Sequence, residues 1–186
     1  INNSVFPGLQ GGPHEHQIAA ISTQLLQVQK PEFKLYIQQV KKNAVALANK
    51  LIELGYHVCS GGTENHIVLV NLKKHGVSGS KVEKICELAN ISINKNSVFG
   101  DTSALSPGGI RLGTSGLTSR DLTEEDFQQV ALFLDEAIQI SLSIQEKSGK
   151  KIVDFNKTLL EEEFQIKIKG LKKKVLDFSC NFPLYD

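Results

Sequence analysis

The chain has 186 residues, of which 40% are hydrophobic and 22% are charged, and its formal net charge is +1. This length can bury the core of one or two domains. No apolar run approaches the ~20 residues of a membrane span, no secretory signal is visible, and the near-neutral charge gives no general attraction to nucleic acid. The cysteines are odd in number and lack metal-ligand spacing, so we expect reduced thiols of an intracellular protein at Cys59, Cys86 and Cys180.

A glycine-rich loop precedes the first predicted helix. Residues 6–13 read Phe-Pro-Gly-Leu-Gln-Gly-Gly-Pro, and apolar residues then recur at helical spacing over 18–28. Pro13 suits the first helical position, where a missing N–H costs nothing. The backbone N–H groups of Gly11 and Gly12 would then lie at the positive end of a helix, which is how proteins hold phosphate. A plain turn at the start of a helix is the alternative.

Two longer elements follow. One continuous apolar stripe predicts a helix over 31–54 that Gly55 ends. The nearly continuous apolar run at 66–72 predicts a central strand that is covered on both faces. A capping box at 80–83 then predicts the start of another helix.

The second half of the chain continues this alternation. Short strands are predicted at 91–93 and 109–112, and Thr123 caps a helix with acidic residues in its first turn. That helix is expected to turn one apolar face inward, with Phe127, Val130, Leu134, Ala137 and Ile138. Strands alternating with amphipathic helices predict an α/β domain in which the helices pack on a sheet.

The segment 107–113, Pro-Gly-Gly-Ile-Arg-Leu-Gly, places Arg111 inside a short predicted strand with glycines on both sides. A guanidinium in that position needs an anion, and its planar fork fits a carboxylate in bidentate fashion. Two interpretations remain open from these residues alone. Arg111 either binds a carboxylate ligand or forms an internal ion pair.

Four motifs together carry a resemblance to a known family. They are 5–14 (Val-Phe-Pro-Gly-Leu-Gln-Gly-Gly-Pro-His), 60–66 (Ser-Gly-Gly-Thr-Glu-Asn-His), 94–96 (Asn-Lys-Asn) and 108–114 (Gly-Gly-Ile-Arg-Leu-Gly-Thr). Their order and spacing resemble serine hydroxymethyltransferase, from the first residue to about residue 145 and more thinly beyond. The resemblance implies a fold-type I enzyme dependent on pyridoxal 5′-phosphate. Such a transferase interconverts serine and glycine in one-carbon metabolism, with tetrahydrofolate as co-substrate.

The resemblance also implies how the chain is organised. Residues 1–54 match the end of a large domain with a long connecting helix, and 55–186 match a small α/β domain with a helical tail. That family binds its cofactor covalently through a lysine in a His-Lys motif, and no lysine of this chain has that context. We therefore expect a C-terminal portion that is inactive alone and holds no catalytic residue. A cytoplasmic homodimer with shared active sites, or a tetramer, is implied; mitochondrial localisation is the alternative.

Site residues follow from the resemblance position by position. Arg111 matches the arginine that binds the α-carboxylate of serine or glycine. Gly12, with Gly11 beside it, matches the glycine that donates to the cofactor phosphate of the neighbouring subunit. Asn96 matches the asparagine that hydrogen-bonds the pterin of folate, for which an amide offers both donor and acceptor. A loop and an aromatic side chain are implied as further folate contacts, namely Ala104, Leu105, Ser106 and Phe6.

Some features depart from this interpretation or leave others open. Phe99 stands where the family usually has proline, which leaves the local shape of the folate loop open. Another aldolase-like enzyme, such as a threonine aldolase, is one alternative, and a non-catalytic binding or dimerisation module is another. The lysine-rich tail after Lys150 could contact RNA or an acidic partner, although a solvated helix face is the simpler interpretation. His14 and His16 lack a third ligand, so we expect no metal site.

Overall fold

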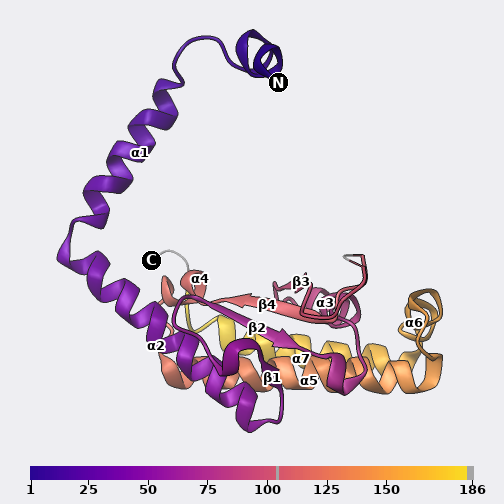
Figure 1. Cartoon of the computed structure of the whole chain (residues 1–186). Coiled ribbons are helices and arrows are strands. Elements are labelled where there is room, and N and C mark those ends of the chain that lie inside the picture. The colour runs from indigo at the N-terminus through magenta and orange to yellow at the C-terminus, as the bar shows by residue number, and fades with distance from the viewer. Residues whose placement is uncertain (104, 184–186) are drawn as a thin grey trace. The chain divides into compact units, whose positions relative to one another are not determined.

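The structure, a computed structural model, describes residues 1–103 and 105–183 (Figure 1). The chain forms two compact units, Ile1–Gln38 and the part from Gln39 onward. The first unit contains η1 (Ser4–Leu9), α1 (Glu15–Val28) and the beginning of α2 (Pro31–Glu53). None of its residues is buried. The boundary that the resemblance implies between a large and a small domain, at residues 54 and 55, is not tested by this division.

The second unit contains the rest of α2, a small sheet and further helices. Its strands are β1 (His57–Val58), β2 (Ile67–Asn71), β3 (Asn94–Asn96) and β4 (Gly109–Gly113). Its other helices are η2 (Cys59–Gly61), η3 (Lys73–His75), α3 (Gly79–Leu88), α4 (Ser115–Thr118), α5 (Glu124–Ser148), α6 (Ile152–Thr158) and α7 (Glu162–Ser179). The α/β class predicted from the alternation of elements is confirmed.

The long predicted helix is present as α2 and ends as expected. Gly55 has a φ of +91°. Its N–H donates to the carbonyl of Ile52 at 2.9 Å, and the N–H of Tyr56 donates to the carbonyl of Leu51 at 2.9 Å. This pair of bonds is the Schellman motif, which satisfies the last carbonyls of a helix and favours glycine at the turning position.

The four strands form one antiparallel sheet in the order β1-β2-β4-β3. The predicted strands at 66–72 and 109–112 are confirmed as the central strands β2 and β4. The strand predicted at 91–93 is wrong, because the ladder bonds are made by the polar residues 94–96 that follow. Ile91 and Ile93 pack half-buried against the core instead. A polar strand is tolerated there because β3 lies at the edge of the sheet.

The sheet has two different faces. The core face carries the fully buried residues of β2 and their cross-strand partners on β4, namely Val68, Val70, Ile110 and Leu112. Side chains alternate along a strand, so the residues between them lie on the opposite face. This open face carries Ile67, Leu69, Asn94, Asn96 and Arg111, and all five are at least partly exposed. Among residues 1–103 and 105–183, the prediction that β2 is covered on both faces is therefore wrong.

Helices cover the core face and enclose one hydrophobic core. In Figure 1 the sheet runs alongside α5 and α7, and α3 contacts both the sheet and α5. The helix cap predicted at Thr123 is confirmed, and it takes the form of a capping box in which the N–H of Thr123 donates to the carboxylate of Asp126 at 2.8 Å. The capping box predicted at Ser80 is wrong. The helix begins earlier, at Gly79, where an added Cβ would lie 2.0 Å from the carbonyl oxygen of Gly109.

The charged tail is helical as expected. Its helices contribute Phe155, Phe164, Ile168 and Leu171 to the core, while the lysines of α7 are exposed. Cys59, Cys86 and Cys180 are free thiols. In the described part of the chain, no helix combines the length and apolar character that a membrane span requires.

Candidate functional site

Arg111 lies at the middle of the central strand β4, on the open face of the sheet. It stands opposite Leu69 of β2 and Asn94 of β3. The apolar neighbours Ile110 and Leu112 point into the core, which fixes the strand and aims the guanidinium away from the core. An arginine is thus displayed on a rigid strand and not on a mobile loop.

The end of this strand is tied to α2. The Thr114 hydroxyl donates to the carbonyl of Val40 at 3.1 Å. The buried amide of Asn43 donates to the Thr118 hydroxyl at 2.9 Å and to the carbonyl of Leu122 at 2.7 Å. These bonds satisfy buried polar groups and hold the segment after β4 in place. They therefore support the strand that carries Arg111.

The guanidinium of Arg111 makes no ion pair with any residue in 1–103 or 105–183. Its hydrogen bond is a long one, from Nη1 to Oδ1 of Asn96 at 3.4 Å. The internal ion-pair interpretation is therefore wrong for the described part of the chain. The fork of Arg111 remains accessible to an anion that approaches the open face.

The glycines at the two ends of β4, Gly109 and Gly113, differ in their surroundings. A Cβ on Gly109 would lie 2.5 Å from Cγ1 of Val98 and 2.7 Å from the carbonyl oxygen of Val70. Glycine at 109 thus allows close approach of the chain itself and not of a ligand. A Cβ on Gly113 would meet no atom within 4 Å. Only Gly109 is therefore required by close packing within the chain.

Asn96 lies on the same face as Arg111, one strand away. Its Nδ2 donates to the carbonyl of Ser97 at 2.7 Å, and its Oδ1 accepts from Arg111. These two contacts orient the amide. They leave one N–H donor and part of the acceptor capacity of Oδ1 unused among the described residues. The structure thus brings together the residues predicted to bind the substrate carboxylate and the pterin.

The loop between β3 and β4 contains the other predicted folate contacts. It opens with a tight turn in which the N–H of Asp101 donates to the carbonyl of Val98 at 3.1 Å and Gly100 has a φ of +83°. This is the pattern of a type II turn, whose second residue is often proline. Phe99 occupies that position and is fully exposed, so its presence leaves the turn type intact. Leu105 and Ser106 are exposed, and Ala104 lies outside the described residues.

The glycine-rich loop belongs to the first unit. Pro13 does not begin the helix as predicted, because α1 starts at Glu15 with His14 as N-cap. The structure gives no internal reason for glycine at 11 and 12. Neither has a positive φ, and an added Cβ would meet nothing within 4 Å. Both residues are exposed, as is Phe6, so their backbone is accessible from outside the chain.

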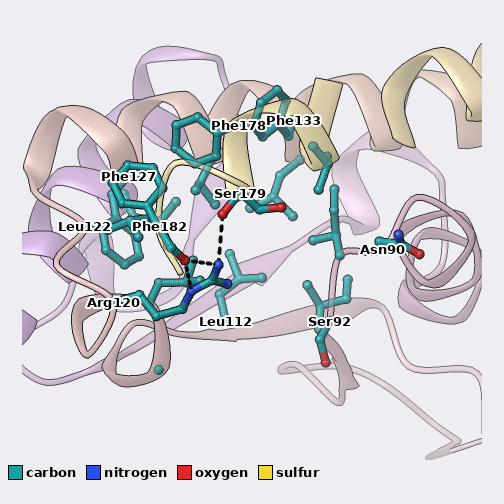
Figure 2. A pocket seen from close by; sticks show the side chains of 18 of the residues that line it. Asn90, Ser92, Leu112, Arg120, Leu122, Phe127, Phe133, Phe178, Ser179 and Phe182 are labelled. Atoms are coloured by element: carbon teal, nitrogen blue, oxygen red, sulfur yellow. Dashed lines mark hydrogen bonds between the residues drawn. The ribbon is translucent and has the colours of Figure 1, made fainter. Parts of the chain in front are cut away.

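Sequence reasoning missed Arg120, which lines a pocket of about 440 Å³ on the core-face side of the sheet (Figure 2). Its Nε donates to the carbonyl of Phe182 at 2.7 Å and its Nη2 to that of Ser179 at 2.9 Å. The pocket is lined mainly by aromatic and aliphatic side chains, among them Leu112, Phe127 and Phe178. No periodicity or motif marks Arg120, because its partners are backbone carbonyls about sixty residues away.

The histidines of the first unit make only local contacts. The rings of His14 and His16 stack with centroids 5.9 Å apart, and His14 also contacts Gln17. Across residues 1–103 and 105–183 there is no group of three His, Cys, Asp or Glu side chains that could hold a metal ion.

Comparison with known proteins identifies the relatives of this chain. The family model described as serine hydroxymethyltransferase matches residues 1–134. Serine hydroxymethyltransferase 4 of Arabidopsis thaliana is 50% identical over 99% of the chain, and the chloroplastic serine hydroxymethyltransferase 3 of that plant is 49% identical. The cytosolic enzyme of Oryctolagus cuniculus is 46% identical, again over 99% of the chain. The chain spans between 35% and 39% of the length of these relatives.

Proposed function

This chain belongs to the serine hydroxymethyltransferase family, and from that premise we propose that the full-length protein interconverts serine and glycine and transfers the one-carbon unit to tetrahydrofolate. One observation carries the proposal. Arg111, without an ion-pair partner in the described chain, stands on the open face of the sheet beside the oriented amide of Asn96. A site for a carboxylate and a site for a polar heterocycle thus lie next to each other.

In this proposal Arg111 binds the α-carboxylate of serine or glycine through its planar fork. Fixing the carboxylate orients the bond at Cα that is to be broken, which is the positioning that an enzyme contributes. Asn96 holds the pterin edge by donating and accepting hydrogen bonds. Since the side chains of Arg111 and Asn96 touch at 3.4 Å, the donor and the acceptor of the one-carbon unit would bind side by side.

The family uses pyridoxal 5′-phosphate, which supplies the electron sink for this chemistry when bound. The glycine-rich loop fits its phosphate, because the exposed backbone at Gly11 and Gly12 carries no Cβ to obstruct an approaching anion. We propose that this loop serves the active site of a neighbouring subunit, together with Phe6. The working enzyme would then be a homo-oligomer, at least a dimer. We also propose that it is cytoplasmic or mitochondrial.

The test is the ratio of two activities in one variant of the full-length protein. Asn96→Ala should lower tetrahydrofolate affinity by about 1–3 kcal/mol, because the pterin loses a hydrogen-bond partner. Cleavage of allo-threonine without folate needs Arg111 but not Asn96, so it should persist. Asn94→Ala is the matched control, since Asn94 lies on the same strand and the same face.

Three outcomes would change the proposal. If both activities fall together in Asn96→Ala, Asn96 holds the loop in shape and does not bind the folate. If Asn94→Ala weakens folate binding equally, the effect comes from β3 in general. If the wild-type protein cleaves β-hydroxy amino acids without any response to tetrahydrofolate, the threonine aldolase type of function replaces this proposal.

A further inference from the structure

The folate loop (residues 97–108) is closed by a single carboxylate. Oδ2 of Asp101 accepts the backbone N–H of Val98 at 2.9 Å and that of Gly108 at 2.8 Å. These donors lie at opposite ends of the loop, beside the strands that carry Asn96 and Arg111. One oxygen atom therefore holds together the two points at which the loop leaves β3 and enters β4.

A lysine from another element completes this arrangement. Lys73 of η3 follows the central strand β2, and its Nζ lies 3.3 Å from Oδ1 of Asp101. The same Nζ donates to the carbonyl of Gly100 at 2.6 Å. The N–H of Leu72, next to Lys73, donates to the carbonyl of Gly108 at 2.8 Å. The loop is thus tied to the end of β2 at both of its ends.

The space around this pair is filled closely. A Cβ on Gly108 would lie 2.5 Å from Cγ of Lys73 and 2.9 Å from Oδ1 of Asp101. A Cβ on Gly100 would lie 3.2 Å from Nζ of Lys73. The side chain of Asp101 is only 11% exposed, and Pro107 and Gly108 are buried, whereas Thr102, Ser103, Leu105 and Ser106 between them are exposed. The closely packed part of the loop is therefore its base.

We infer that Asp101 and Lys73 are positioning residues for folate: through the base of the loop they hold Asn96 and the segment around Leu105 in the geometry that binds the pterin. The inference rests on the proposed function and extends it to two residues that do not themselves contact folate. It requires the carboxylate specifically, because Oδ2 serves two N–H donors while Oδ1 faces an ammonium group.

Replacing the Asp101 carboxylate by an amide separates its two roles, which are to accept two backbone N–H groups and to face the Lys73 ammonium group. Asp101→Asn keeps a carbonyl oxygen for the N–H groups of Val98 and Gly108, but its NH₂ group would face the Lys73 ammonium, and donors repel donors. Lys73→Met removes the ammonium and keeps an apolar stem of similar length. If the pair acts as a unit, the double variant should be no worse than Asp101→Asn alone, because coupled residues are not additive.

Asp126→Asn provides the control. The Asp126 carboxylate accepts the N–H of Thr123, three residues earlier, at 2.8 Å, just as Asp101 accepts the N–H of Val98. The local bond is the same, but Asp126 lies in the first turn of α5, outside the folate loop. A fall in general stability would therefore appear in both variants, whereas loss of loop geometry would appear only in Asp101→Asn.

The experiment measures the Michaelis constants for tetrahydrofolate and serine, folate-independent cleavage of allo-threonine, and amide hydrogen exchange over 97–108, in the full-length holoenzyme. In Asp101→Asn we expect the Michaelis constant for tetrahydrofolate to rise about tenfold. A change of this size corresponds to the loss of one hydrogen bond. Exchange in the loop should become faster, while the serine constant and the cleavage activity stay within about twofold of wild type. Asp126→Asn should leave the folate constant unchanged.

Two results would overturn the inference while the proposed function stands. One is a folate constant in Asp101→Asn within about twofold of wild type although loop exchange is faster. The other is a rise in the folate and serine constants together with loss of cleavage, which would make Asp101 a support of the whole unit. A wild-type protein without folate dependence would instead refute the proposed function itself.

Discussion

At the scale of single residues, the setting of Arg111 shows how a buried strand can present a charged group. Ile110 and Leu112 on either side are nearly fully buried, at 1% and 5% exposure, and they pin β4 to the core. The guanidinium between them is exposed and lies against Asn96. The apolar neighbours provide the rigidity that keeps a bidentate donor in one orientation.

Substitution of Arg111 is therefore expected to weaken carboxylate binding. Arg111→Ala in the full-length protein should weaken serine and glycine binding by about 2–5 kcal/mol, the range for removing one member of a close charge pair. Arg111→Lys should recover only part of this loss, because an ammonium group cannot reproduce the planar fork. Titration calorimetry with glycine measures both effects.

Lys95→Ala serves as the comparison for Arg111. Lys95 lies on the neighbouring strand β3, where it pairs with Glu83 of α3 at 3.5 Å. Removing this cation should leave glycine affinity unchanged. An equal loss in Lys95→Ala and Arg111→Ala would mean that general positive charge, and not the fork of Arg111, attracts the substrate.

At the scale of elements, a buried tyrosine joins two helices. Tyr56 follows the end of α2, and its hydroxyl donates to Oδ1 of Asp135 on α5 at 2.5 Å. Burial, and then this bond to a carboxylate, raise the pKa of Tyr56 well above its ordinary value. The folded protein thus keeps the phenol proton at a pH where the unfolded chain loses it.

The sign of the pH dependence follows. Above about pH 10 the unfolded state binds fewer protons at this site than the folded state, so stability falls as the pH rises through that region. Tyr56→Phe should reduce this fall. At pH 7 it should lower stability by about 1–3 kcal/mol, because a hydrogen bond to a charged group is lost.

Urea unfolding at pH 7, 9 and 10.5 measures both changes for Tyr56→Phe. Identical alkaline slopes in the variant and the wild type would show that other groups set the pH dependence. An unchanged free energy of unfolding at pH 7 would show that the bond between Tyr56 and Asp135 contributes nothing net.

Most elements were predictable from the sequence because their signals are local. The apolar stripe and Gly55 predicted α2 with its end, and Thr123 with the acidic residues after it predicted the start of α5. The strand at 94–96 was not predictable by propensity, since its ladder is decided by pairing with β4 and not by its own polar residues. Ser80 gave a false start for α3 because the close approach of Gly79 to Gly109 is a tertiary contact.

The candidate site was predictable in part. Arg111 and Asn96 were found by motif, and the structure places them in contact. Asp101 and Lys73 gave no signal as a pair, because the bonds that join them arise from the return of the loop to the end of β2. Arg120 was missed for the same reason, since its partners are carbonyls of residues 179 and 182.

At the scale of the whole chain, the two units differ in what they contribute to stability. Buried residues begin at Val40, and residues 1–38 add none to the core. Four large apolar side chains of α1 are more than half exposed, namely Ile18, Ile21, Leu25 and Leu26. An exposed apolar helix face of this kind marks a surface that associates with other surfaces.

Removing residues 1–30 should therefore leave the free energy of unfolding unchanged and reduce self-association. The shortened chain should unfold with a free energy within about 0.5 kcal/mol of the 186-residue chain, because no buried contact is lost. It should also bind much less of the dye ANS and self-associate less. Urea unfolding, dye fluorescence and light scattering measure these effects. A large loss of stability would show that α1 supports the core.

The Arg120 contact with the carbonyls of Ser179 and Phe182 has a consequence for biosynthesis. Ribosomes deliver a polypeptide from its amino end, and domains generally fold as they emerge. Here α7 supplies Phe164, Ile168 and Leu171 to the core, and the Arg120 contact needs Ser179 and Phe182, which are translated later still. The second unit therefore cannot complete its fold on the ribosome until residue 182 has left the exit tunnel. During that interval the apolar surface that Phe164, Ile168 and Leu171 later cover stays exposed to solvent.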